Sequence, residues 1–332
     1  MMTNHSYVPF SFEDAAGMVE EGLSNLKLPD APAKLYDPIR YVLSGGGKRL
    51  RPSLVLAACS LFSDKPRQAM PAALAVEVFH NFTLVHDDIM DHAPLRRNKP
   101  TVHRKWNRNI AVLSGDVMSV LAYHLLSGVP SRRLIPVLRI FNKTAMEVCE
   151  GQQMDMDFEN AREVSEEEYI RMIGLKTGSL LAASLQLGAV LGGSSASDAD
   201  ALHACGLNLG ISFQLKDDWL DVFGDPEKFG KRTGGDILSD KKTFLLIKAM
   251  ELARGHVKEE LHSLIGNKRV PDLEKVGRMK DIYLQLNIGQ ITRDKMDVYY
   301  RKASASLEQV SVTEQRKRIL KKFAGRLMER EN

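Results

Sequence analysis

The chain has 332 residues, of which 44% are hydrophobic and 27% are charged, and its formal net charge is +4. This composition is ordinary for a globular protein and excludes a disordered or fibrous chain. The mild positive charge does not require nucleic acid as a partner, but it suits anionic substrates such as phosphates. Cys59, Cys149 and Cys205 lie far apart without metal-ligand spacing, which favours a reducing cytoplasmic compartment over a disulfide framework.

No targeting or membrane-spanning segment is predicted. The first residues do not combine a basic region with an apolar run, so we expect no signal peptide. The longest uncharged stretch, residues 177–197, is rich in Gly, Ser and Ala and is interrupted by Gln186. It is therefore interpreted as a buried core helix rather than as a transmembrane segment.

Apolar residues recur at helical spacing along most of the chain, and alternating strand patterns are scarce. The predicted helices cover Leu54–Phe62, Pro71–Val85, Ile110–Leu126, Leu134–Met154, Ser179–Leu191 and Ala201–Val222. Glycines and prolines separate them, but no linker or repeat marks a domain boundary. We therefore predict an all-α protein with a single domain over residues 1–332. The basic C-terminal helix has two interpretations, a solvated surface helix or a tail that closes over phosphate.

The first acidic motif is LAVEVFHNFTLVHDDIMD, residues 74–91. Asp87 and Asp91 are one helical turn apart and share a face, and Asp88 flanks them. Carboxylates this close repel one another, and hard divalent cations such as magnesium accept ligands of this kind. The alternative is a solvated acidic helix end.

The second acidic motif is FQLKDDWLDVFGD, residues 213–225. Its polar residues fall at i, i+3, i+4 and i+7, so they form one stripe on a helix that is otherwise apolar: Gln214, Asp217, Asp218 and Asp221. Burying unpaired carboxylates is costly, and a metal ion removes that cost. Two such stripes in one chain predict that shared cations clamp one polyanion.

Basic residues accompany both acidic motifs. Residues 45–52, GGGKRLRP, place Lys48 and Arg51 three apart at a predicted helix start, although the spacing is not that of a Walker A loop. Arg96 and Arg97 follow the first acidic motif. Other candidate diphosphate ligands are Lys176, which with Thr177 is expected to open a later helix, and Lys231 and Lys241, which bracket a glycine turn.

These segments resemble the trans-isoprenyl diphosphate synthase (polyprenyl synthetase) family. The likeness extends from about residue 40 to about residue 310. It rests on GGGKRLRP, on EVFHNFTLVHDDIMD with the following LRRNKPTVH, on LKTGSL, on FQLKDDWLDVFGD and on GKRTGGDILSDKKT. The resemblance implies an isoprenoid-synthase-type helical bundle around a central apolar cavity, and it implies a homodimer.

The resemblance also implies roles for individual residues. The isopentenyl diphosphate site is Lys48, Arg51, His80 and Arg97. The allylic diphosphate site is Arg96, Lys176, Lys231 and Lys241. Three magnesium ions are held by Asp87, Asp88, Asp91 and Asp217, with Asp218 and Asp221 supporting through water. Catalytic dipoles that face the developing carbocation come from Thr177 and Gln214, next to Lys176. Asn98 departs from the family pattern, which often has glycine there, but asparagine tolerates the left-handed turn.

By this resemblance the enzyme ionises an allylic diphosphate, isopentenyl diphosphate attacks the cation, and the departing pyrophosphate takes the proton. Phe82 and Thr83, five and four residues before Asp87, help to set product length. One aromatic and one small residue are typical of geranylgeranyl diphosphate synthases, so a C20 product is expected, with C15 and C25 as neighbours. The alternative is that Phe82 only packs in the core.

Other functions fit less well. A terpene cyclase or a head-to-head synthase needs no isopentenyl diphosphate site, which GGGKRLRP and His80 provide. A non-catalytic subunit of a heteromeric synthase is expected to lack part of one acidic motif, and both are complete here. A diphosphate-binding or structural protein without activity is the remaining alternative.

Overall fold

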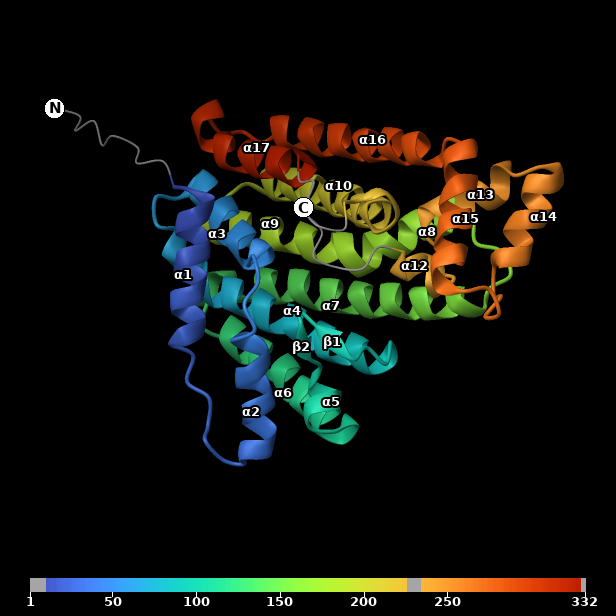
Figure 1. Cartoon of the computed structure of the whole chain (residues 1–332). Helices are drawn as coiled ribbons and strands as arrows, with labels where there is room; N and C mark the ends of the chain where they lie inside the picture. Colours follow the sequence, from blue (N-terminus) through green and yellow to red (C-terminus); the bar gives the residue numbers. More distant parts are fainter. Residues whose placement is uncertain (1–9, 226–233, 330–332) are drawn as a thin grey trace. The chain divides into compact units, whose positions relative to one another are not determined.

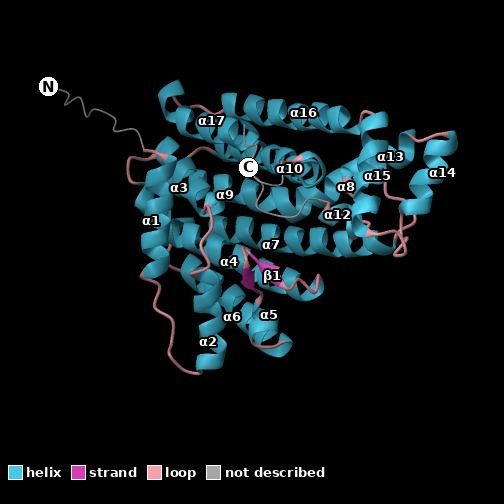
Figure 2. Cartoon of the chain, viewed as in Figure 1, coloured by secondary structure: helices cyan, strands magenta, loops and turns pink. Residues whose placement is uncertain are grey.

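The computed structural model describes residues 10–225 and 234–329, which are almost entirely helical (Figure 2). Within these ranges the strands are β1 (Leu95–Arg96) and β2 (Lys99–Pro100). They pair antiparallel, with Leu95 opposite Pro100 and Arg96 opposite Lys99. The predicted all-α class is confirmed.

The chain divides into two compact units. The first takes its residues from Met1–Asn142, Ala183–Leu202 and Val310–Leu320, and the second from Lys143–Ala182, His203–Gln309 and Lys321–Asn332. Four helices, which are labelled in Figure 1, contribute residues to both units: α7 (Ser131–Asn160), α9 (Ser179–Gly192), α10 (Ala196–Phe223) and α17 (Glu314–Glu329).

In the first unit, the helices α3 and α4 are buried over more than half of their length. Every residue of α3 from Pro52 to Leu61 is buried, because this helix is apolar on all sides. α4 packs against α3 and runs along α6. The elements that lie wholly within this unit are α1 (Phe12–Ser24), α2 (Ala33–Leu43), α3 (Leu50–Phe62), η1 (Pro66–Ala69), α4 (Met70–Met90), α5 (Val102–Lys105) and α6 (Arg108–Leu126).

The second unit holds the other acidic motif on the C-terminal part of α10. A core of Tyr169, Ile211, Leu215 and Phe244 packs around this part of the helix. Ser165 and Glu168 form a capping box that starts α8, satisfying backbone N–H groups at its first turn. The elements are α8 (Glu166–Ile173), η2 (Gly174–Gly178), α12 (Gly235–Leu238), α13 (Phe244–Leu252), α14 (Gly255–Leu264), α15 (Asp272–Gln285) and α16 (Ile288–Glu308).

All six helices predicted from periodicity are present and extend slightly further than predicted, as α3, α4, α6, α7, α9 and α10. The C-terminal segment is also a helix, α17, whose apolar residues Leu320, Phe323 and Leu327 are buried. Its Arg316 pairs with Asp64 at 2.7 Å. These contacts pack one face of α17 against the protein, and both interpretations, a solvated surface helix and a tail that closes over phosphate, stay predictions.

Two helical stretches have the length and apolar composition of a membrane span, Arg108–Leu126 and Glu166–Gly192. The core helix of a globular protein meets the same criteria. In Glu166–Gly192 the apolar window is 72% buried, which agrees with the predicted core helix. In Arg108–Leu126 only 33% of the window is buried.

Candidate active site

The first acidic motif lies at the C-terminal end of α4. The helix ends at Met90, and Asp91 caps it by donating its backbone N–H to the carbonyl of Asp87 at 2.8 Å. Asp91 is exposed, Asp87 is half-buried and Asp88 is buried. Burial raises the pKa of Asp88, and the positive charge of Arg96 opposes this shift. The end of one helix therefore carries three carboxylates, of which one is buried, one is half-buried and one is exposed.

Arg96 and Arg97 are placed by the β1–β2 hairpin. Arg97 and Asn98 form its turn, and both have positive φ, 52° and 59°. Two consecutive left-handed residues are the geometry of a type I′ turn, which asparagine tolerates. The turn therefore persists without the family's usual glycine. Arg96 Nε donates to Asp88 Oδ1 at 2.7 Å, which joins the hairpin to the acidic motif.

The glycine-rich segment forms the loop between α2 and α3. Arg97 donates from Nη1 to the carbonyl of Gly46. Gly47 has φ of +138°, a backbone conformation that favours glycine, and an added Cβ there would lie 2.9 Å from Arg97 Nη1. Lys48 lies in the loop, since α3 begins at Leu50. The prediction that Lys48 and Arg51 share one side of a helix start is wrong, because left-handed Arg49 separates them.

Arg51, on the first turn of α3, contacts His80 on α4. Arg51 Nη1 lies 3.3 Å from His80 Nε2. Burial, followed by the charges of Arg51 and Arg97, lowers the pKa of His80 well below its usual value of 6.5. Guanidinium groups only donate, so this contact requires the neutral imidazole with Nε2 as acceptor. The three segments that carry Arg51, His80 and Arg97 are thus brought together within the first unit.

Arg97 also lines a cavity of ≈ 50 Å³ in the first unit. Its lining combines apolar and polar side chains and includes Gly45, Asn81, Asp88, Arg96 and Arg97. The glycine-rich loop, the hairpin and the first acidic motif therefore all line this cavity.

Phe82 and Thr83 lie on α4 one to two turns before the acidic motif. The Phe82 ring is 5.4 Å from the Phe79 ring and 4.7 Å from the His86 ring. Thr83 donates to the carbonyl of His80 at 2.8 Å. Both side chains are half-buried, so Phe82 packs in an aromatic cluster while part of it remains accessible.

The second acidic motif lies in the last turns of α10. Asp218 is buried, while Asp217, Asp221 and Gln214 are half-buried. Gln214 Nε2 donates to Asp218 Oδ1 at 3.0 Å, and Thr177 donates to Gln214 Oε1 at 3.0 Å. The backbone N–H of Asp236 donates to Asp221 Oδ2 at 3.0 Å. The predicted polar stripe therefore exists, and its members are held by partners from other elements of the second unit.

Tyr169 is a site residue that sequence reasoning missed. This buried side chain of α8 donates its hydroxyl to Asp218 Oδ2. Burial and then the charge of Asp236 raise the pKa of Asp218 to about 7, and the hydrogen bonds from Tyr169 and Gln214 oppose the shift. A tyrosine in an apolar helical stripe carries no sequence signal that separates it from a core residue.

Lys176 lies within the π-helical turn η2. Helix runs without a break from Glu166 to Gly192, so the prediction that Lys176 and Thr177 open a helix is wrong. The π turn inserts at Gly174–Gly178, and such insertions recur at functional sites. An added Cβ at Gly151 of α7 would lie 2.3 Å from the Lys176 backbone nitrogen, so glycine there permits the close approach.

Asp155 on α7 is the second residue that sequence reasoning missed. Its Oδ2 is 2.6 Å from Lys176 Nζ and 3.9 Å from Lys241 Nζ. The Asp155 carboxylate therefore lies within 4 Å of the ammonium groups of two predicted diphosphate ligands. Asp155 ends the segment GQQMD, residues 151–155, which has no other charged residue. The sequence therefore gave no sign that Asp155 belongs to a site. The other predicted ligand, Lys231, lies outside the described residues.

The donor set fits a magnesium ion, which prefers carboxylate oxygens and retains water and phosphate ligands. Candidate ligands are Asp87, Asp88 and Asp91 in the first unit and Asp217, Asp218 and Asp221 in the second. Within residues 10–225 and 234–329, no three His, Cys, Asp or Glu side chains already converge as a metal-binding group.

Comparisons with known proteins identify the family of the chain. The family model described as polyprenyl synthetase matches residues 32–285. The chain belongs to the polyprenyl synthetase family. The resemblance inferred from the sequence is therefore confirmed.

Individual relatives match three quarters or more of the chain. Geranylgeranyl diphosphate synthase of Sulfolobus acidocaldarius is 36% identical over 310 residues, which are 92% of this chain and 93% of the relative. Geranylfarnesyl diphosphate synthase of Natronomonas pharaonis is 38% identical over 268 residues, 75% of this chain and 79% of the relative.

Solved structures share the fold. A geranylgeranyl pyrophosphate synthase matches with a TM-score of 0.93 and 41% identity, over 97% of this chain and all of the other. A polyprenyl synthase of Caulobacter crescentus, complexed with calcium and isoprenyl diphosphate, matches with a TM-score of 0.85 and 29% identity, over 96% of each chain.

Proposed function

We propose that this chain is a prenyltransferase that condenses isopentenyl diphosphate with an allylic diphosphate and releases an all-trans prenyl diphosphate. The observation that carries the proposal is the convergence of Arg51, His80 and Arg97 in the first unit. Arg51 lies 3.3 Å from His80, and Arg97 reaches the glycine-rich loop at Gly46. Cationic donors around a loop of exposed backbone suit a diphosphate, and a terpene cyclase has no use for this second anion site.

The main product proposed is C20 geranylgeranyl diphosphate. A single aromatic residue, Phe82, precedes the motif at the position where family members limit the growing chain. Relatives that cover most of the chain are named for geranylgeranyl and geranylfarnesyl diphosphate, so C25 is the nearest alternative and C15 the next.

Magnesium completes the proposed site, held by the carboxylates of the two acidic motifs. When bound, it neutralises the diphosphate and improves it as a leaving group. Lys176 and Lys241 donate to the allylic diphosphate in the second unit, and Asp155 holds both ammonium groups in place. In the first unit, Arg96 is also a donor to the allylic diphosphate, and Asp88 orients its guanidinium.

The reaction then depends on dipoles and on the exclusion of water. Thr177 and Gln214 form a hydrogen-bonded pair, and their oxygens stabilise the developing allylic cation. The double bond of isopentenyl diphosphate attacks this cation, and the new carbon–carbon bond forms as one proton is lost. The departing pyrophosphate accepts that proton.

We further propose that the protein is a homodimer. α6 exposes apolar side chains that a globular surface seldom leaves in water: Val112, Leu113, Val120 and Tyr123. Val120 is 68% exposed and Leu113 is 56% exposed, so a second copy would bury much apolar area. Light scattering of purified protein tests this, and a monomer at working concentrations would contradict it. The cytoplasmic location stays a prediction that rests on the small number and wide spacing of the cysteines.

The decisive experiment is product formation by the purified protein. Magnesium, isopentenyl diphosphate and geranyl or farnesyl diphosphate are supplied, and products are separated by reverse-phase chromatography. A C20 product that requires both substrates supports the proposal. Hydrocarbon formed from the allylic diphosphate alone would favour a cyclase, and no product would favour a non-catalytic subunit.

A further inference from the structure

The loop that carries Lys48 and leads into the first turn of α3, where Arg51 lies, is fixed by a side chain that itself faces away from solvent. Arg49 is only 4% exposed. Its backbone has φ of +46°, in the left-handed region that residues other than Gly, Asn and Asp seldom occupy. A neighbouring interaction must therefore hold this conformation.

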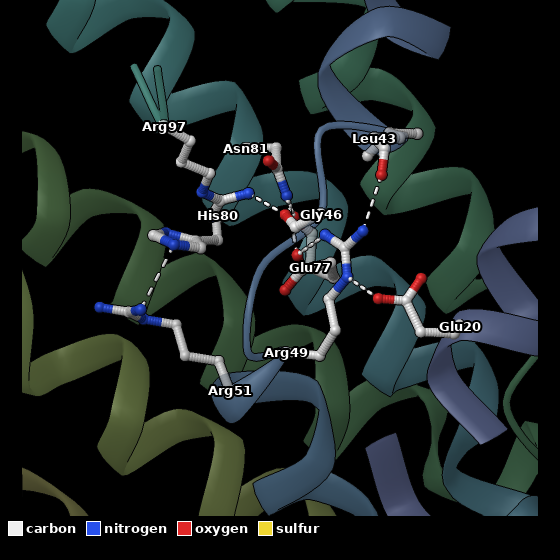
Figure 3. Close-up of polar contacts among 9 residues, drawn as sticks. All are labelled: Glu20, Leu43, Gly46, Arg49, Arg51, Glu77, His80, Asn81 and Arg97. Carbon is white, nitrogen blue, oxygen red and sulfur yellow. Dashed lines mark hydrogen bonds and ion pairs between the residues drawn. The ribbon is translucent and has the colours of Figure 1, made fainter. Parts of the chain in front are cut away.

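Three helices supply that interaction (Figure 3). Arg49 Nε donates to Glu20 Oε1 on α1 at 2.7 Å, and Nη1 donates to Glu77 Oε1 on α4 at 2.6 Å. Nη2 donates to the carbonyl of Leu43 at the end of α2, at 2.7 Å. Each guanidinium nitrogen has one acceptor, which is the planar fork geometry that lysine cannot reproduce.

The contact with Glu77 reaches the predicted anion site. Glu77 is 2% exposed and lies one helical turn before His80. Its Oε1 also accepts from Asn81 Nδ2 at 3.0 Å, and Asn81 lines the cavity beside Asp88 and Arg96. Arg49 thus links the loop to the stretch of α4 that holds His80, and two carboxylates neutralise its charge.

A neutralised guanidinium is a poor ligand for a diphosphate, and a buried ion pair on balance adds little net stability. We propose that Arg49 is a positioning residue for isopentenyl diphosphate: its ion pair with Glu77 fixes the left-handed turn that places Lys48 and Arg51 around the anion. This inference rests on the proposed function. It gives a role to Arg49, which lies between the predicted diphosphate ligands Lys48 and Arg51.

The test separates the Michaelis constants of the two substrates. Glu77→Gln retains the shape of the side chain but removes the charge that faces Arg49. If this single variant does not fold, the double variant Arg49→Met/Glu77→Gln replaces it. The double variant removes both charges, so neither is left buried without its counter-charge. The matched control is Glu21→Gln. Glu21 lies beside Glu20 on α1, and the substitution breaks its exposed ion pair with Arg67.

We expect both variants to raise the Michaelis constant for isopentenyl diphosphate by about tenfold or more, the change that about 1.4 kcal/mol of binding free energy produces. The constant for the allylic diphosphate and kcat should stay within about twofold, and Glu21→Gln should match the wild type. An unchanged constant for isopentenyl diphosphate, or an equal rise for both substrates, would overturn the inference.

Coupling with Arg51 provides a second readout that loss of stability alone would not produce. If Arg49 acts by placing Arg51, then Arg51→Ala should raise the Michaelis constant for isopentenyl diphosphate less in the Glu77→Gln background than in the wild type. Additive effects would contradict positioning. A wild type that forms no prenyl product would overturn the proposed function together with this inference, whereas an active wild type with an unmoved constant would overturn the inference alone.

Discussion

Asp155 on α7 and Lys176 in the π turn form an ion pair in which Oδ2 and Nζ are 2.6 Å apart. Lys241 approaches the same oxygen at 3.9 Å. The pair ties a lysine of the proposed allylic diphosphate site to a carboxylate that no sequence motif indicated.

Asp155→Asn should lower turnover roughly tenfold to a hundredfold, because a hydrogen bond to a charged group contributes about 1.5–3 kcal/mol. Lys176 would remain present but would lose the partner that orients it. Steady-state kinetics measure the effect. Glu147→Gln, which removes the partner of the exposed Lys143 on the same helix, is the control and should leave turnover unchanged.

Asp87→Asn and Asp217→Asn should each leave the fold intact and reduce magnesium-dependent turnover by several orders of magnitude. Each substitution removes one carboxylate ligand, and with it part of the stabilisation of charge on the leaving diphosphate. Circular dichroism verifies folding. Near-normal turnover of either folded variant with magnesium would show that the two acidic motifs do not act together.

Lys48→Ala should raise the Michaelis constant for isopentenyl diphosphate far more than that for the allylic primer. Lys176→Ala, and by the same reasoning Lys231→Ala, should act on the allylic diphosphate or mainly on turnover. The reason is that each lysine is assigned to one diphosphate only. Initial rates over a grid of both substrates distinguish the cases, and equal effects on both substrates would refute the assignment.

Phe82→Ala should shift the product distribution from C20 to longer chains when farnesyl diphosphate is the primer. The ring lies about 7.5 Å before Asp87 along the helix axis, and its removal opens space beside Phe79 and His86. Stability should fall by up to about 3 kcal/mol, because an aromatic cluster loses one member. Phe141→Leu, in the same cluster, controls for a general loosening of packing. An unchanged distribution in the folded variant would mean that Phe82 only packs in the core.

The neutral state of His80 makes the stability of the protein depend on pH. Its pKa is lowered in the folded state, so the unfolded chain binds a proton first as the pH falls below about 6.5. Wild-type stability should therefore decrease relative to His80→Gln by about 1.4 kcal/mol for each pH unit below that value, until the folded-state pKa is reached. Above about pH 7 the difference between the two should not vary with pH. Denaturant unfolding at pH 5.5 and 7.5 measures it, and a pH-independent difference would contradict a neutral His80.

The helices and both acidic motifs were predictable from the sequence because their signals are local. Apolar spacing defines α3, α4, α6, α7, α9 and α10, and the stripe from Gln214 to Asp221 follows from helical geometry alone. The ordered motifs also identified the family. These inferences need only the chain within a few turns of each residue.

The partners of the site residues depended on the tertiary structure. Asp155, Tyr169 and Arg49 gave no signal, since the local sequence does not show which distant residue a charged side chain or a tyrosine will contact. Sequence spacing also placed Lys48 on a helix face and Lys176 at a helix start, and both positions were wrong. The left-handed turn at Arg49 is held by Glu20 and Glu77, and the π turn is accommodated at Gly151. Each of these conformations is unfavourable locally and is stabilised by residues far away in the sequence, which is why only the folded chain decided them.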